Sequence, residues 1–391
     1  MAREREFDVV VYGATGYTGR LVAEYLVKEY GGSTVHWAMA GRSESKLAAV
    51  RDEIGAPAET PFIVADAGDE GSLRTMADRA HVVLTTVGPY QLYGSDLVAA
   101  CAVAGTDYVD LCGEPAWMRA MIDAHHETAR SSGARIVFSC GFDSIPFDLG
   151  VLFLQDEAVK RFGAPVPRVK GRVRKMRGGF SGGTAASLKA TMAAVEKNPD
   201  LAQLLISPFA LTPGFEGAPQ PTGAEPYEDE SVGAWVTPFI MAVINTKNVH
   251  RSNFLMHHRY GKDFQYDEMT ITGPGAAGKS AAEGLASMDP LGGGGGPKPG
   301  EGPTPEERLA GHYDVLFIGE AADGRTVRAG VTGDRDPGYG STSKMISESA
   351  LCLLTDATDT PGGVWTPAPA LGRALIDRLI AHAGLTFQIE D

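Results

Sequence analysis

The chain has few cysteines and no pattern that would join them. Its 4 cysteines are scattered through 391 residues, and no CxxC pair occurs. This spacing suggests neither a zinc knuckle nor a disulfide framework. The adjacent histidine pairs, His125-His126 and His257-His258, would point about 100° apart on a helix, and there is no HExxH sequence. We therefore expect reduced thiols and no bound metal.

Long hydrophobic runs and an excess of positive charge are also missing. The most apolar stretches, 201–209 and 238–244, are short and contain proline, whereas a membrane-spanning helix needs about 20 apolar residues. The first ten residues, MAREREFDVV, leave no room for a secretory signal. A net charge of −14 disfavours nonspecific binding to nucleic acid. We expect a cytoplasmic protein without a transmembrane span or a nucleic-acid partner; peripheral membrane association stays open.

The sequence FDVVVYGATGYTGRL, at residues 7–21, predicts a nucleotide-binding turn. Three valines fit a buried parallel strand, glycines follow at every third position, and apolar residues then recur at helical spacing. A turn without side chains lets backbone N–H groups and a helix N-terminus approach a diphosphate. An ordinary strand-to-helix turn is the alternative. The residues predicted to hold the diphosphate are Gly13, Ala14, Thr15, Gly16, Tyr17, Thr18 and Gly19.

The second predicted strand, 35–40, leads to a basic residue where NAD-binding proteins carry an acid. An acidic residue at this position accepts a hydrogen bond from the ribose 2′-OH of NAD, whereas an arginine pairs with the 2′-phosphate of NADP. The sequence has Arg42, followed by Ser43 and Lys46. These residues predict NADP(H) as cofactor, with a solvated loop arginine as the alternative.

Six predicted strands alternate with helices up to about residue 140, which is the pattern of a doubly wound parallel sheet. The carboxyl ends of such strands face the cofactor crevice. We therefore expect Asp66 and the segment formed by Val87, Gly88 and Pro89 beside the cofactor. Tyr90 is expected to reach the nicotinamide ring, and a packed turn aromatic is an equally weighted alternative for this residue.

Beyond about residue 160 the pattern changes to α+β. Residues 165–176 alternate, which predicts an antiparallel strand with Lys170, Arg172 and Arg174 on a basic face. A glycine loop and a helix follow, so we expect a second anion-binding corner around Ser181 and Thr184. The alternative is a charged face in solvent beside a flexible turn.

Three units are expected along the chain. A Rossmann-type dinucleotide-binding domain spans 1–145, and an α+β substrate or dimerisation domain on a mixed or antiparallel sheet spans 146–338. C-terminal helices in 339–391 are expected to pack back on the first domain. The glycine-rich run 292–302 is expected to be mobile or to act as a lid.

The segments GATGYTGR, AGRS, VGPYQLYG, YVDLCGE and CGFDSIPFDLG together resemble the saccharopine dehydrogenase-like oxidoreductases. The later GGVWTPAPALG is similar to their actinobacterial branch, the trans-acting enoyl reductases. The resemblance implies a Rossmann fold, NADP(H), and reduction of an α,β-unsaturated acyl thioester in polyketide or complex lipid biosynthesis. The implied substrate is carried by CoA or by an acyl carrier domain of a polyketide synthase. The family's cofactor residues carry over onto the three glycines and Arg42, but no catalytic residue does.

For such a reduction, hydride passes to the β-carbon, the enolate oxygen needs hydrogen-bond donors, and the α-carbon needs a proton. We expect donors from the turn between Ser181 and Thr184, and Tyr90 or Asp143 as the proton relay. Two other functions stay open: an imine reductase or amino-acid dehydrogenase, and a non-catalytic nucleotide-binding protein associated with lipid. Homodimer formation also stays open.

Overall fold

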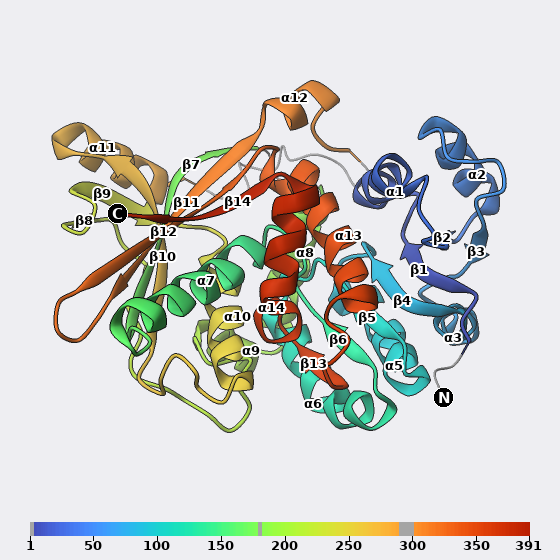
Figure 1. The fold of residues 1–391 in the computed structure, drawn as a ribbon, viewed down its shortest axis with the longest axis horizontal. Helices are drawn as coiled ribbons and strands as arrows, with labels where there is room; N and C mark the ends of the chain where they lie inside the picture. The colour runs from blue at the N-terminus through green and yellow to red at the C-terminus, as the bar shows by residue number, and fades with distance from the viewer. Residues whose placement is uncertain (1–3, 179–181, 289–300) are drawn as a thin grey trace.

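Two seven-stranded sheets organise the computed structural model, which describes residues 4–178, 182–288 and 301–391 (Figure 1). The first sheet has the order β13-β6-β5-β4-β1-β2-β3, and neighbouring strands in it run parallel. Its first six strands in the chain are β1 (Phe7–Tyr12), β2 (Trp37–Gly41), β3 (Phe62–Val64), β4 (Ala80–Thr85), β5 (Asp107–Val109) and β6 (Arg135–Val137).

Both faces of the first sheet are buried, because helices cover each side. Val9 and Val11 of β1 belong to one apolar core, and Val10 and Tyr12 belong to the other. This alternation confirms the predicted doubly wound sheet. The helices that connect its strands are α1 (Tyr17–Tyr30), α2 (Glu44–Glu53), α3 (Glu70–Arg79), α4 (Tyr90–Tyr93), α5 (Ser95–Ala104) and α6 (Pro115–Ser132). Helix α7 (Ile145–Phe162) follows β6 but packs against the second sheet.

The second sheet is mixed, with the order β14-β12-β11-β7-β10-β9-β8. Strand β7 runs antiparallel to β11 but parallel to β10, so the strand predicted at 165–176 is antiparallel on one side only. The mixed sheet confirms the predicted fold class. Its strands are β7 (Arg168–Arg177), β8 (Tyr227–Asp229), β9 (Ala234–Pro238), β10 (Gln265–Gly273), β11 (His312–Glu320), β12 (Thr326–Gly333) and β14 (Leu385–Glu390).

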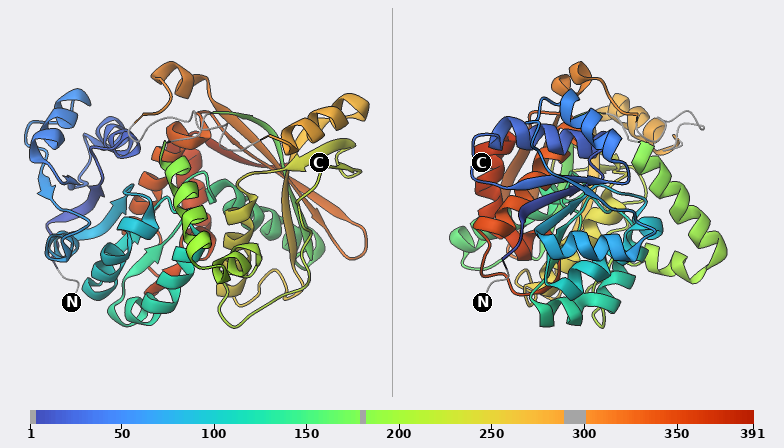
Figure 2. Two further views of the ribbon diagram at one scale, coloured as in Figure 1. Left: turned by 180° about the vertical axis from the view of Figure 1, so that it is seen from behind. Right: turned by 90° about the vertical axis from the view of Figure 1, so that its right-hand side faces the viewer.

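Helices α8 and α9 lie on the opposite side of the molecule from α13 and α14 (Figure 2).

None of the helices in the described ranges is long and apolar enough to cross a membrane. The remaining helices are α8 (Gly182–Lys197), α9 (Asp200–Ile206), α10 (Ala242–Leu255), α11 (Gly275–Ala286), α12 (Pro305–Ala310), α13 (Thr342–Thr355) and α14 (Pro367–Arg378), with π-helical turns at Pro337–Ser341 and Leu379–Ala383.

The C-terminal segment contributes strands as well as helices. Helix α13 packs against α1 and β4. Strand β13 (Gly363–Trp365) joins the first sheet beside β6, and β14 joins the second sheet beside β12. The unit expected at 339–391 is therefore shared between the two sheets.

The basic face predicted on β7 is wrong, because carboxylates from other strands neutralise it. Arg172 is 0% exposed and donates to Asp229 Oδ2 at 2.7 Å and to Asp267 Oδ2 at 3.0 Å. These carboxylates come from β8 and β10, and a buried cation requires such partners. The flanking cations are paired as well: Arg174 with Asp314 at 2.7 Å and Glu390 at 2.6 Å, and Lys170 with Glu320 at 2.7 Å.

Candidate active site

The glycine turn after β1 is shaped by contacts that exclude side chains. Gly13 has φ +90°, and a Cβ there would lie 2.8 Å from Thr86 Oγ1. A Cβ on Gly19 would lie 2.1 Å from Gly13 O, so helix α1 packs directly on the turn. Gly16 caps α1 without a side-chain hydrogen bond. The first N–H groups of α1 are thus left to a ligand, and the helix dipole favours an anion there.

Arg42 follows β2 directly and is exposed, and no residue in the described ranges forms an ion pair with it. It lies near Tyr12 and Asp66: burial and the Asp66 carboxylate together raise the pKa of Tyr12 to about 12, against the lowering effect of Arg42. The ends of β1, β2 and β3 therefore present an unpaired guanidinium where the adenosine ribose of a dinucleotide lies.

The other predicted ribose contacts have local partners. Ser43 caps α2, its hydroxyl accepting from Lys46 N at 3.4 Å. Asp66 accepts from Gly68 N at 2.9 Å. The Lys46 side chain is exposed.

A buried carboxylate fixes the loop that carries Val87, Gly88 and Pro89. Glu114 is 2% exposed and accepts from Tyr90 N and Gln91 N, both at 2.9 Å. These N–H groups begin α4, so the negative charge also stabilises the helix start. The loop at the end of β4 is therefore fixed at the carboxyl end of the first sheet, the end at which dinucleotides bind to such sheets.

Tyr90 is 5% exposed, and the backbone engages its hydroxyl. The phenol donates to Thr85 O at 3.3 Å and accepts from Leu111 N at 3.0 Å. Its ring lies 5.6 Å from the Trp117 ring. This is the packed turn aromatic that was the alternative, and these contacts do not support a proton relay through Tyr90.

Helix α8 is bonded to the same loop. Ser187 Oγ donates to Glu114 Oε1 at 2.8 Å, and Gln91 Nε2 donates to Thr191 Oγ1 at 3.2 Å. The described part of α8 thus lies along the crevice. Of the predicted oxyanion donors, Ser181 falls outside the described residues and the side chain of Thr184 is likewise not described.

Asp143 lies in the turn between β6 and α7, at the carboxyl end of the sheet. Its side chain is half-buried, and no described residue donates a hydrogen bond to it. Burial raises the pKa of Asp143 to about 7. This carboxyl holds a proton near neutral pH, which is the property a general acid requires.

A buried acid that the sequence did not single out supports this turn. Glu268 on β10 is 1% exposed and accepts from Tyr266 Oη and Asn245 Nδ2, both at 2.9 Å. Asn245 Oδ1 accepts in turn from Ser144 Oγ at 3.0 Å. The second domain thus anchors the residue next to Asp143. The sequence pair Asp267-Glu268 could have predicted this buried acid. Adjacent residues of a strand face opposite sides of the sheet, so one of the two carboxyl groups had to point inward.

A cavity of about 180 Å³ lies between α6, α8 and α9, next to the loop that follows β4. Its apolar lining comes from Trp117, Ala194, Val195, Leu201 and Leu205.

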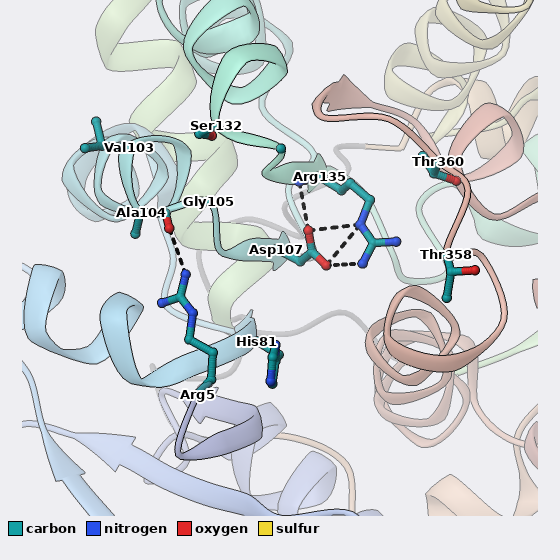
Figure 3. Close-up of a pocket in the computed structure, with 11 residues that line it drawn as sticks. Arg5, His81, Val103, Ala104, Gly105, Asp107, Ser132, Arg135, Thr358 and Thr360 are labelled. Atoms are coloured by element: carbon teal, nitrogen blue, oxygen red, sulfur yellow. Dashed lines mark hydrogen bonds and ion pairs between the residues drawn. The ribbon is translucent and has the colours of Figure 1, made fainter. Parts of the chain in front are cut away.

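A cavity of about 600 Å³ lies at the opposite, amino end of the first sheet (Figure 3). Its charged groups are engaged by the protein: Arg135 pairs with Asp107, and Arg5 donates to Ala104 O at 2.7 Å. Asp107 and Arg135 are the first residues of β5 and β6. Because dinucleotides bind at the carboxyl ends of such strands, this cavity is not the cofactor site.

Residues 9–137 match the family model described as saccharopine dehydrogenase NADP binding domain. The match includes the glycine turn and Arg42, so the predicted cofactor NADP(H) is confirmed.

Relatives are similar over nearly the whole chain. A protein of Mycobacterium tuberculosis named putative trans-acting enoyl reductase is 42% identical over 99% of this chain and 98% of its own length. A trans-acting enoyl reductase of Mycobacterium bovis is 38% identical over 96% of each chain. The apo saccharopine dehydrogenase (L-Glu forming) of Saccharomyces cerevisiae shares the fold, with a TM-score of 0.56, 11% identity, and coverage of 98% of this chain and 100% of that one.

Proposed function

This chain belongs to the trans-acting enoyl reductase family of saccharopine dehydrogenase-like oxidoreductases, and on that basis we propose that it reduces the α,β double bond of an acyl thioester with NADPH. The observation that carries the proposal is the position of Asp143, an unpaired carboxyl at the carboxyl end of the sheet that also carries the NADP-binding turn.

The residues present fit NADP(H). Gly13 and Gly19 let the start of helix α1 pack directly on the turn after β1, and Arg42 offers an exposed guanidinium to the 2′-phosphate. The bound cofactor supplies the hydride that enters the β-carbon of the substrate.

Asp143 is the proposed proton donor to the α-carbon. The Ser144–Asn245–Glu268 chain of hydrogen bonds holds its turn in place. The proposed source of donors to the enolate oxygen is the segment from Ser181 to Thr184, which includes the first residues of helix α8, because α8 is bonded to the loop after β4. The proposed contacts with the cofactor diphosphate also include Ala14, Thr15, Tyr17 and Thr18.

The proposed carrier of the acyl group is CoA or an acyl carrier domain of a polyketide synthase, since both present the same thioester. We also propose that the reaction serves polyketide or complex lipid biosynthesis. The same proposal includes peripheral contact with lipid and formation of a homodimer.

The alternative of amino-acid dehydrogenation needs cations for the substrate carboxylates. The sequence offers one run of cations for this purpose, from Lys170 to Arg177. Within it, Lys170, Arg172 and Arg174 form ion pairs inside the second sheet, so these three do not support binding of a substrate carboxylate.

The test measures the loss of NADPH absorbance in two assays. One contains a crotonyl or longer enoyl thioester, and the other contains a 2-oxo acid and an amine. We expect oxidation only with the enoyl thioester. Asp143→Asn should lower turnover by about 10²–10⁴-fold and leave NADPH affinity unchanged. Asp323→Asn, at an exposed hairpin tip, is the matched control. NADPH binding without turnover of any enoyl thioester would overturn the proposal and favour the non-catalytic alternative.

A further inference from the structure

The cavity beside α4 has a lining whose polar groups are already satisfied by one another. Gln91 Nε2 donates to Thr191 Oγ1 at 3.2 Å. Glu114 accepts three hydrogen bonds, from Tyr90 N, Gln91 N and Ser187 Oγ. A polar ligand would find few free partners in this lining, whereas an apolar ligand would leave every existing bond intact.

The remaining wall is hydrocarbon and aromatic surface. Trp117 contributes one side and is 6% exposed, so its ring is firmly packed. The other apolar residues come from α8 and α9, which close the cavity from the second domain. Such a wall gains free energy from each methylene that it removes from water, at about 0.8 kcal/mol per CH₂.

Exposed apolar residues lie on the same segments as the cavity lining. Leu92 at 61%, Met192 at 55% and Ile206 at 73% exposure directly follow the lining residues Gln91, Thr191 and Leu205 in the sequence. These segments therefore carry apolar surface outside the cavity as well as inside it.

The position of the cavity relates it to the reaction. Gln91 lies two residues after Pro89, and Glu114 holds that loop at the end of β4. The loop borders the nicotinamide side of the crevice.

We propose that this cavity is the subsite for the acyl chain of the substrate, so that the enzyme selects thioesters with an extended, apolar chain beyond the reacting double bond. The identity of the substrate rests on the proposed function, whereas binding of a saturated acyl chain tests the subsite without any turnover. The volume of about 180 Å³ encloses only part of a long chain.

The experiment uses the emission of Trp117, which lines the cavity. Saturated decanoyl-CoA, butanoyl-CoA and free CoA are titrated into the full chain, and the Trp117→Phe variant identifies the signal of this tryptophan among the 4 in the sequence. We expect decanoyl-CoA to bind at least tenfold more tightly than butanoyl-CoA, and free CoA to leave Trp117 emission unchanged.

Two substitutions on one helix separate filling of the cavity from a general effect. Ala194 lines the cavity, whereas its neighbour Ala193 is exposed. Ala194→Phe should weaken decanoyl-CoA binding at least tenfold, and Ala193→Phe should leave it unchanged; both should keep wild-type NADPH affinity. If Ala194→Phe fails to fold, Leu205→Gln, at a half-buried position, should give the same loss.

Equal affinity for butanoyl-CoA and decanoyl-CoA, or wild-type binding by Ala194→Phe, overturns the subsite. Chain-length-dependent binding without NADPH oxidation keeps the subsite and overturns the proposed reduction. NADPH oxidation at a rate that does not depend on chain length keeps the proposed reduction and overturns the subsite.

Discussion

The Arg308 guanidinium donates a hydrogen bond of 2.7 Å to the hydroxyl of Tyr17, the first residue of α1 after the glycine turn. Arg308 also donates to Pro303 O at 2.9 Å. Gly302 lies against the same tyrosine, since a Cβ there would be 2.6 Å from its ring. The segment 301–310, which comes from the second half of the chain, is therefore anchored on the diphosphate-binding turn.

Tyr17→Phe should loosen this segment without disturbing the fold. The ring and its packing remain, but Arg308 loses one of its two acceptors and Pro303 O loses the donor Tyr17 Oη; each bond contributes about 1 kcal/mol. We expect faster amide hydrogen exchange in 301–310, measured by mass spectrometry, and unchanged exchange in β1. Tyr93→Phe, at an exposed position on α4, is the control. Unchanged exchange in 301–310 would show that the segment is held by other contacts.

Arg42→Ala should separate the two nicotinamide cofactors. A charge-assisted bond to the 2′-phosphate contributes about 1.5–3 kcal/mol, so NADPH affinity should fall about 10- to 100-fold while NADH affinity stays the same. Calorimetric titration measures both. Arg373→Ala, which removes an exposed arginine of α14, should change neither value. Equal losses for both cofactors would show that Arg42 does not contact the 2′-phosphate.

The pH dependence of the reduction should report Asp143. Burial raises the pKa of this carboxyl to about 7, and a proton donor must be protonated to act. Single-turnover oxidation of NADPH should therefore be fast below pH 7 and decline as the pH rises through about 7. Asp143→Asn should be slow and flat across the same range. An unchanged alkaline decline in the Asn variant would assign it to another group.

Arg172→Ala should affect stability and leave cofactor binding intact. The substitution removes the fully buried cation that the Asp229 and Asp267 carboxylates share and leaves them to Lys170 and Arg168 respectively, which destabilises by about 3 kcal/mol. Urea unfolding measures the loss. Arg325→Ala, at the exposed end of a hairpin, should change stability by less than about 1 kcal/mol. A loss of NADPH affinity in folded Arg172→Ala would restore the anion-binding role that the ion pairs contradict.

The first domain was predictable because its signals are local. Val9 to Val11 are buried on both faces of a parallel strand, and Gly13 and Gly19 make contacts that only glycine allows. A strand of this kind followed by such a turn has few alternative structures.

The errors occurred where a distant partner decides the outcome. The alternation around Arg172 correctly gave a strand, but Asp229 and Asp267, which bury its charge, come from strands far along the chain. The role of Tyr90 likewise depends on Thr85 O and Leu111 N, which strand pairing brings to its hydroxyl. No local pattern contains this information.

Strands β13 and β14 were missed for a related reason. β13 has 3 residues and derives its stability from pairing with β6. The sequence showed helical periodicity around these strands, and propensity is a weak guide to such short elements.

The crossing of the C-terminal segment from one sheet to the other determines how the polypeptide can be divided. A gene fragment that stops after β12 would encode two incomplete sheets, one lacking β13 and the other lacking β14. Neither half can be produced as an independent unit by a single cut. Because β13 and β14 both follow β12 in the chain, each sheet is completed only after this segment has been synthesised.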